Sequence, residues 1–301
     1  MKKKARNIIL ILVFLIGLGV FSYPTLSNKF NEYKNQNIIK KYEENKEELP
    51  KESQSTKEES QLDILLKKME EYNEKIYNDK QKDLKDPFSY EESSFDLTEF
   101  GFSDNIVGYI SIPVMEIELP IYLGANLENM AKGAVQMSQT SLPIGGENTN
   151  CVIAAHRGYK YQAMFRDIEA LSIGDEVKIT NLWDTLEYRV CEIKIIDPSD
   201  VPEVLIQEGR DLVTLITCHP YTKNYKRYVV YCERVNNDES NDNNETSTVN
   251  KETSSVEKTS TGEDNILKTE KTIRGLVVYI IGFAIFIIAI RFVWKKFKKW
   301  N

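Results

Sequence analysis

Seven short runs rich in Val, Ile, Thr and Tyr recur between residues 105 and 235, and they limit the possible folds more than any other feature of the chain. Glycine-containing turn signals at residues 124, 145–146, 158 and 174 separate several of these runs. Many short strands at such a spacing are typical of a β-barrel or a β-sandwich. We therefore expect an all-β domain whose strands are the runs NIVGYISIP, EIELPIY, NCVIAAH, DEVKIT, TLEYRVCEIKII, DLVTLIT and YKRYVVYCERV.

Helical patterns are few in comparison. Residues 59–77 place apolar side chains at approximately helical spacing, which predicts a helix with one weak apolar stripe laid against the domain. Residues 161–171 predict a helix inside the strand-rich part, and residues 126–131 predict a second, short one. The domain is therefore expected to be a sheet structure with short helices.

Each end of the chain carries an apolar run beside a basic cluster. The run at residues 8–23 follows a basic segment, and no small-residue cleavage pattern follows it at 21–24. An uncleaved signal anchor is therefore favoured over a cleaved signal peptide. Residues 275–290 carry no charge and are followed by a cluster of lysines at 295–299, which favours a second membrane span over a buried core helix.

The two basic clusters also predict the topology, because Lys and Arg beside a membrane span tend to stay in the cytoplasm. Residues 24–272, including the folded domain, would then lie on the extracellular side of the cell membrane. Residues 236–271 are too poor in apolar side chains to offset the entropy lost on ordering. We expect five parts: a cytoplasmic basic tail with the N-terminal anchor (1–33), a charged, partly helical linker (34–87), one folded domain (88–235), a disordered tether (236–271), and a C-terminal transmembrane helix with its basic cytoplasmic tail (272–301).

The four cysteines do not form the framework of a small disulfide-rich protein. Cys191 and Cys232 both fall in predicted strands, so a disulfide between them stays open, whereas Cys151 fits a small apolar core residue. No set of residues has the spacing of a zinc site, and we expect neither a metal nor an organic cofactor. Cys218, at the end of the run DLVTLITC, is the candidate for chemistry.

A cysteine nucleophile needs a base or a cation beside it, and the chain offers two histidines. His219 follows Cys218 directly, but successive side chains of a strand point to opposite faces. Adjacency therefore positions His219 poorly, unless the strand ends at that point. His156 is the better partner, because it ends the run CVIAAH just before the glycine at 158, and so belongs to a strand end as Cys218 does.

Arg227 lies nine residues after Cys218 and begins the next strand-like run. A strand that leaves the same rim would carry its guanidinium beside the cysteine, where a fixed cation can polarise a carbonyl and stabilise an oxyanion. We therefore predict that His156, Cys218 and Arg227 meet at one rim of the barrel.

The motifs around these three residues resemble those of the sortases, which are membrane-anchored cysteine transpeptidases of Gram-positive bacteria built on a closed eight-stranded β-barrel. The similar segments are VGYISIP at 107–113, TSLPIGGENTNCVIAAHRG at 140–158 and TLITCHPYTKNYKRYVV at 214–230, within a resemblance that covers residues 86–235. The resemblance implies a closed eight-stranded barrel here as well. It implies that His156 is the general acid and base, Cys218 the nucleophile, and Arg227 the ligand of the substrate carbonyl and oxyanion.

Three features resemble class C, the sortases that polymerise pilins. They are the expected second membrane span, the sequence motifs SLPIGGENT, HRG and PYTKN, and the tripeptide DPF at 86–88. In class C an Asp-Pro-aromatic lid pairs its aspartate with the catalytic arginine and covers the cysteine with its ring, which implies a lid made by Asp86 and Phe88. The chain departs from that class at His219, where a small residue is usual. We treat Thr217 and His219, which flank the cysteine, as accessory residues.

The resemblance implies an acyl transfer. Cys218 would attack the Thr-Gly peptide bond of an LPXTG-like sorting signal, and the thioester would pass its acyl group to a pilin lysine. The expected partners are pilins or surface proteins with such a signal, and the membrane; nucleic acid is not expected. Two alternatives stay open: a sortase that anchors surface proteins to an amine of peptidoglycan, and a non-catalytic, membrane-tethered β-barrel binding module. A papain-like protease is disfavoured, because its cysteine precedes its histidine along the chain.

Overall fold

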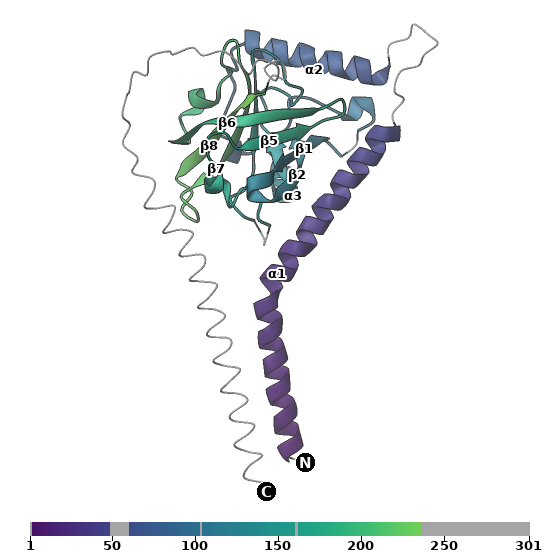
Figure 1. Cartoon of the computed structure of the whole chain (residues 1–301), viewed down its shortest axis with the longest axis vertical. Coiled ribbons are helices and arrows are strands. Elements are labelled where there is room, and N and C mark those ends of the chain that lie inside the picture. The colour runs from purple at the N-terminus through teal and green to yellow at the C-terminus, as the bar shows by residue number, and fades with distance from the viewer. Residues whose placement is uncertain (1, 49–59, 103, 160–161, 236–301) are drawn as a thin grey trace, which may run out of the picture. The chain divides into compact units, whose positions relative to one another are not determined.

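The computed structural model describes residues 2–48, 60–102, 104–159 and 162–235, and within them eight strands close a barrel (Figure 1). Around the barrel the strand order is β1-β2-β3-β4-β7-β8-β6-β5. The expected closed eight-stranded barrel is thereby confirmed. The strands are β1 (Ile106–Ile112), β2 (Ile117–Leu123), β3 (Ala134–Gln136), β4 (Thr149–Ala154), β5 (Glu176–Thr180), β6 (Thr185–Ile196), β7 (Asp211–His219) and β8 (Lys226–Arg234).

Seven of these strands coincide with the seven predicted runs, and β3 was not predicted. β3 is only three residues long, so it shows no periodicity of its own. It pairs in parallel with β2 and antiparallel with β4, and it thereby joins two strands that have no direct contact in the barrel order.

Three α-helices and five short 3-10 helices complete the described part of the chain. The helices expected at 59–77 and 126–131 are confirmed as α2 and α3. Their bounds are α1 (Lys2–Glu48), α2 (Gln61–Asn78) and α3 (Leu127–Lys132), with 3-10 helices η1 (Pro87–Ser89), η2 (Thr98–Phe100), η3 (Pro113–Met115), η4 (Ile168–Ala170) and η5 (Val201–Val204).

The helix predicted at 161–171 is wrong. In its described part, 162–171, the chain makes turns and then the single 3-10 helix η4. Met164 has a φ of 44°, in the left-handed region, which interrupts a right-handed helix. The amide of Phe165 donates to the carbonyl of His156, at 3.1 Å, rather than to a carbonyl within the segment. Contact with the end of β4 therefore decides the local structure.

Two apolar clusters lie on the two faces of the barrel wall. Along β4, Cys151 and Ile153 belong to the inner cluster, whereas Val152 and Ala154 belong to an outer one. All six residues of β4 are buried, which explains the continuous apolar run from Cys151 to Ala154. Phe88, from the segment before β1, packs against the outer cluster.

Helix α2 lies against the barrel, as its apolar stripe predicted. Ser60 and Asp63 form a capping box at its N-terminus, and Leu65 and Met69 are fully buried in the inner cluster. Asn73 fixes the helix to the loop before β4, because its amide oxygen accepts from the N–H of Leu142, at 2.7 Å, and its amide nitrogen donates to the carbonyl of Leu142, at 3.4 Å.

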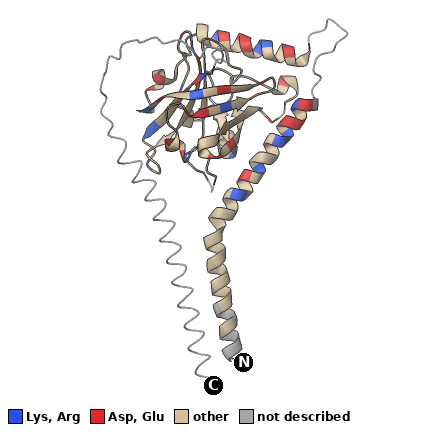
Figure 2. Cartoon of the chain, in the orientation of Figure 1, with Lys and Arg blue, Asp and Glu red and all other residues tan. Residues whose placement is uncertain are grey.

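Among the described residues, one helical stretch is long and apolar enough to cross a membrane: Ile11–Glu47 of α1, in which an 18-residue window has a mean hydropathy of 1.6. A membrane anchor and a signal sequence both have this length and composition. Beyond the basic cluster at residues 2–6, the charged residues of α1 occur only from Lys29 on, in its second half (Figure 2). That half also contacts the barrel, since the Tyr42 hydroxyl donates to the carbonyl of Val107, at 3.1 Å. The tether and second span expected at 236–301 lie outside the described residues.

The Asn73 clamp leads to a stability prediction. In the Asn73→Ala variant the buried N–H of Leu142 loses its side-chain partner, so the free energy of unfolding should fall by about 1–3 kcal/mol. The Glu74→Ala variant, at an exposed position of the same helix, is the control and should change it by less than about 0.5 kcal/mol. Chemical denaturation of the purified protein measures both. Equal effects for the two variants would contradict the role given to Asn73.

Candidate active site

The site begins with the parallel pairing of β4 and β7. Six residue pairs hold one register, from Thr149 opposite Asp211 to Ala154 opposite Ile216. In a parallel pair, residues in register point to the same face, and neighbouring strands lie about 4.8 Å apart. Whatever follows both strands in the same register is therefore delivered to one place.

The register continues beyond the last strand pair. The amide of Ala155 donates to the carbonyl of Ile216, at 3.3 Å, and the hydroxyl of Thr217 donates to the carbonyl of Ala155, at 2.7 Å. The next residues in this register are His156 and Cys218, which we call the rim pair. The pairing thus brings together a histidine and a cysteine that are distant in the sequence.

Arg227 joins the rim pair from the other side of β7. In the antiparallel pairing of β7 with β8, Arg227 stands directly opposite Cys218. Its side chain is 8% exposed, and its guanidinium also donates to the carbonyls of Asn224 and Lys226, at 3.2 and 3.0 Å. The structure therefore places all three predicted residues at one rim.

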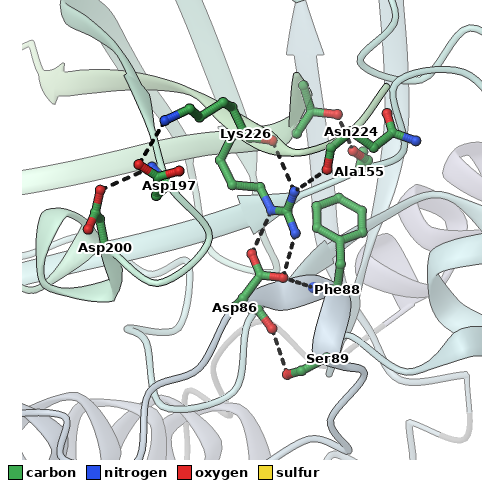
Figure 3. A network of polar contacts seen from close by, with 10 residues as sticks. Asp86, Phe88, Ser89, Ala155, Asp197, Asp200, Asn224 and Lys226 are labelled. Atoms are coloured by element: carbon green, nitrogen blue, oxygen red, sulfur yellow. Dashed lines mark hydrogen bonds and ion pairs between the residues drawn. The ribbon is translucent and has the colours of Figure 1, made fainter. Parts of the chain in front are cut away.

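The predicted lid residues lie on this rim as well (Figure 3). The carboxylate of Asp86 accepts two bonds from the Arg227 guanidinium, 2.6 Å from Nε and 2.8 Å from Nη2. It also accepts from the amide of Phe88, at 3.2 Å, which fixes the turn of η1. The Phe88 ring lies 4.8 Å from the Arg227 guanidinium and 5.8 Å from the His156 ring, so it covers both.

These neighbours decide the protonation of the rim pair. Burial raises the pKa of the Cys218 thiol, and the Asp86 carboxylate adds to this effect, while Arg227 and Arg157 oppose it. Burial lowers the pKa of His156. At neutral pH the described state therefore contains a thiol and a neutral imidazole, with the cation Arg227 bound to a carboxylate.

His219 does not join the rim pair. Its Nδ1 lies 2.8 Å from Nη1 of Arg157 and 3.2 Å from a carboxylate oxygen of Glu169, and its ring lies 5.6 Å from that of Tyr228. The sequence reasoning did not single out Arg157 or Glu169. Arg157 was detectable in principle, because it follows His156 as His219 follows Cys218, and the strand register therefore pairs them.

The other cysteines lie apart from this chemistry. All four cysteines are free thiols, and Cys151 is a buried core residue, as expected. Among the described residues, no group of three His, Cys, Asp or Glu side chains is arranged to hold a metal ion. The rim itself presents a thiol, an imidazole and a guanidinium.

Comparison with known proteins gives a consistent assignment. A sortase-domain family model matches residues 110–235. Sortase A of Bacillus anthracis is 34% identical over 125 residues, which cover 42% of this chain and 58% of that protein, so the match spans less than two thirds of that relative.

Solved structures match over more of their own length. Sortase C-1 from Streptococcus pneumoniae is 30% identical with a TM-score of 0.58, over 66% of this chain and 98% of that one. Sortase C1 of GBS pilus island 1 is 28% identical with a TM-score of 0.59, over 72% of this chain and 96% of that one. The chain belongs to the sortase family, and its similar solved structures are sortases of class C.

Proposed function

We propose that this protein is a membrane-anchored cysteine transpeptidase that cleaves an LPXTG-like sorting signal between Thr and Gly and transfers the acyl group to a pilin lysine. The observation that carries the proposal is the convergence at one rim of Cys218, the register-paired His156 and the opposed Arg227. Membership in the sortase family supports the reaction class.

The three side chains have complementary tasks in this reaction. His156 takes the proton of the Cys218 thiol, and the thiolate attacks the Thr carbonyl of the signal. The Arg227 guanidinium binds the carbonyl oxygen as it becomes an oxyanion. His156 then returns the proton to the leaving amine of Gly, and a thioester remains on Cys218. An incoming amine loses its proton to His156, attacks the thioester and releases the thiol.

Asp86 and Phe88 act as the lid in this proposal. The Asp86 carboxylate occupies both guanidinium positions that would otherwise face a substrate carbonyl, and the Phe88 ring lies over the guanidinium. A sorting signal can bind only after this segment has moved. The described arrangement is therefore the resting state of the enzyme.

Two observations favour a pilin lysine as the acceptor. The first is the lid, and the second is the similarity to solved class C sortases, one of which is encoded in a pilus island. The competing assignment is an anchoring sortase with the same barrel and a peptidoglycan amine as the acceptor. The two assignments differ only in the amine that resolves the thioester, so acceptor choice separates them.

The rest of the chain serves to hold the barrel at the cell membrane. In this proposal residues 1–33 and 272–301 are the two membrane anchors with cytoplasmic basic ends, 34–87 is the linker with the lid, and 236–271 is the tether. The uncharged stretch of α1 at residues 7–28, which follows the basic cluster, supports the first anchor. The catalytic barrel, 88–235, would then lie on the extracellular side.

The nucleophile can be tested directly. Incubation with a sorting peptide should add the mass of its acyl part to the peptide containing Cys218, as detected by mass spectrometry. The Cys218→Ala variant should form no adduct, whereas the Cys191→Ala variant, which removes a different half-buried thiol, should form it as the wild type does. An adduct or cross-linked product in Cys218→Ala would favour the non-catalytic alternative for this site.

The acceptor can be tested on the wild-type thioester. Addition of a pilin domain or a peptidoglycan-like amine should release the adduct from Cys218, and faster release by the peptidoglycan-like amine would overturn the pilin assignment.

The lid can be tested through the reactivity of the thiol. The Asp86→Asn variant removes a charge that raises the pKa of Cys218 and also frees Arg227. The thiolate fraction at pH 7 should rise, and alkylation of Cys218 should accelerate about tenfold for each unit by which its pKa falls.

The Phe88→Ala variant should also accelerate the labelling of Cys218, because it uncovers the site. Asp83→Asn, an exposed position of the same segment, is the matched control. Peptide mapping of iodoacetamide labelling measures the rates, and equal rates in all four proteins would count against the lid.

A further inference from the structure

Side-chain contacts join the ends of β4 and β7 one residue before the rim pair and one residue after it. One residue before it, Thr217 bonds the carbonyl of Ala155, and one residue after it, Arg157 bonds His219; both contacts join residues 62 apart. Successive side chains along a strand alternate between faces, so Arg157 and His219 point away from the face that carries the rim pair. A second pair of side chains thus joins the ends of β4 and β7 behind the reactive one.

The guanidinium of Arg157 is held from several directions. Nη2 forms an ion pair with a carboxylate oxygen of Glu169. Nη1 donates to Nδ1 of His219, at 2.8 Å, and to the carbonyl of Cys218 itself, at 3.4 Å. The guanidinium carbon lies 6.0 Å from the ring centroids of both Tyr221 and Tyr228, within the range of cation–π attraction.

The contact with Arg157 defines the role of the His219 ring. An arginine has only donors, so in this 2.8 Å contact the Nδ1 of His219 accepts with its lone pair. Burial lowers the pKa of His219 and the charge of Arg157 lowers it further, while Glu169, 3.2 Å from the same nitrogen, opposes them. The residue that departs from the usual small residue of class C therefore serves as an acceptor for Arg157.

Stability alone explains this arrangement poorly. The Arg157 side chain is 5% exposed, and its Nε has no hydrogen-bond partner among the described residues. Burial of a charged pair typically costs about as much desolvation energy as the pair returns, and a well-packed apolar substitute is often as stable. The contact with the carbonyl of Cys218 indicates a role at the nucleophile instead.

We propose that Arg157, held by Glu169 and His219, is a positioning residue that locks the end of β4 to the end of β7, keeps Cys218 opposite His156, and supplies a fixed positive charge behind the thiol. The proposal rests on the proposed function of Cys218 as the nucleophile. It differs from the role of Arg227, which faces the substrate side and is occupied by Asp86 in the resting state. None of the bonds of Arg157 described above involves the lid, so this charge stays in place when the lid opens.

The charges around Cys218 come from three elements. Arg227 on β8 and Arg157 after β4 favour the thiolate, and Asp86 before η1 disfavours it. The effect of Arg157 is therefore measured best in the Asp86→Asn background, in which the lid charge is absent. Each variant is analysed by the pH midpoint of Cys218 alkylation, by kcat and KM for hydrolysis of a sorting peptide, and by thermal unfolding.

The Arg157→Gln variant removes a positive charge near the thiol, so the pH midpoint of Cys218 alkylation should rise. It should also lower kcat by about 100-fold, because misplacement of a reacting group by about 1 Å causes a loss of that size. The change in KM should be much smaller. Arg157→Lys keeps the charge but loses the two-pronged geometry, so the midpoint should stay near that of the parent while kcat falls. His219→Asn keeps an acceptor near the position of Nδ1 and should behave like the parent. His219→Leu removes that acceptor but not the charge of Arg157, so it should behave like Arg157→Lys.

The matched control is Arg210→Gln. Arg210 forms a part-buried pair with Glu233, at 2.9 Å, at the opposite end of β7, so its loss tests a similar ion pair far from the thiol. This variant should leave the midpoint and kcat unchanged. The same unchanged values in Arg157→Gln would overturn the proposal. If Arg157→Gln does not fold, Glu169→Gln decides. This variant keeps the charge of Arg157 but removes a group that holds it, so a lower kcat without a rise of the midpoint supports the proposal, and the parent kcat overturns it. Alkylation needs no substrate, so a wild type without a peptide adduct would refute the proposed function while this measurement still tests the placement of Arg157.

Discussion

The parallel pairing of β4 with β7 is the constraint on which the rest of this site depends. Its register is fixed by six residue pairs, buried on both faces of the barrel wall, and a slip of one residue would turn every apolar side chain to the wrong face. The same register places His156 beside Cys218 just after the last pair. The packing energy of the barrel therefore also brings the reacting groups close together.

The second constraint is the charge balance at the rim. Arg227 is almost fully buried, and a buried cation left without a partner is costly. Asp86 satisfies it with two bonds in the resting state, and a substrate carbonyl would replace that partner during the reaction. Because Asp86 also raises the pKa of Cys218, the contact that satisfies the arginine keeps the nucleophile protonated. The proposed movement of this one short segment would therefore change the partner of Arg227 and the pKa of Cys218 at once.

Much of this arrangement is predictable from the sequence, because it follows from local patterns. Seven strands were identified by β-branched runs, and strand alternation favoured His156 over His219 as the partner of Cys218. The failures have a common cause in tertiary contacts. The three-residue strand β3 exists only through its neighbours, and the segment after residue 161 forms turns because Phe165 bonds the end of β4. Arg157 and Glu169 acquire a role only once the register is known, since neither belongs to a pattern by itself.

Disulfide trapping tests the register of the rim pair most directly. A His156→Cys substitution, made together with Cys191→Ser to remove a competing thiol, places two thiols at positions that the account puts on neighbouring strands and on one face. Their Cα atoms should then fall within the roughly 4.4–6.8 Å that a disulfide requires. Under mild oxidation, peptide mapping should find a bond between position 156 and Cys218, and moving the same substitution to position 157 should greatly reduce it. Equal bonding from both positions, or none from position 156, would contradict the account.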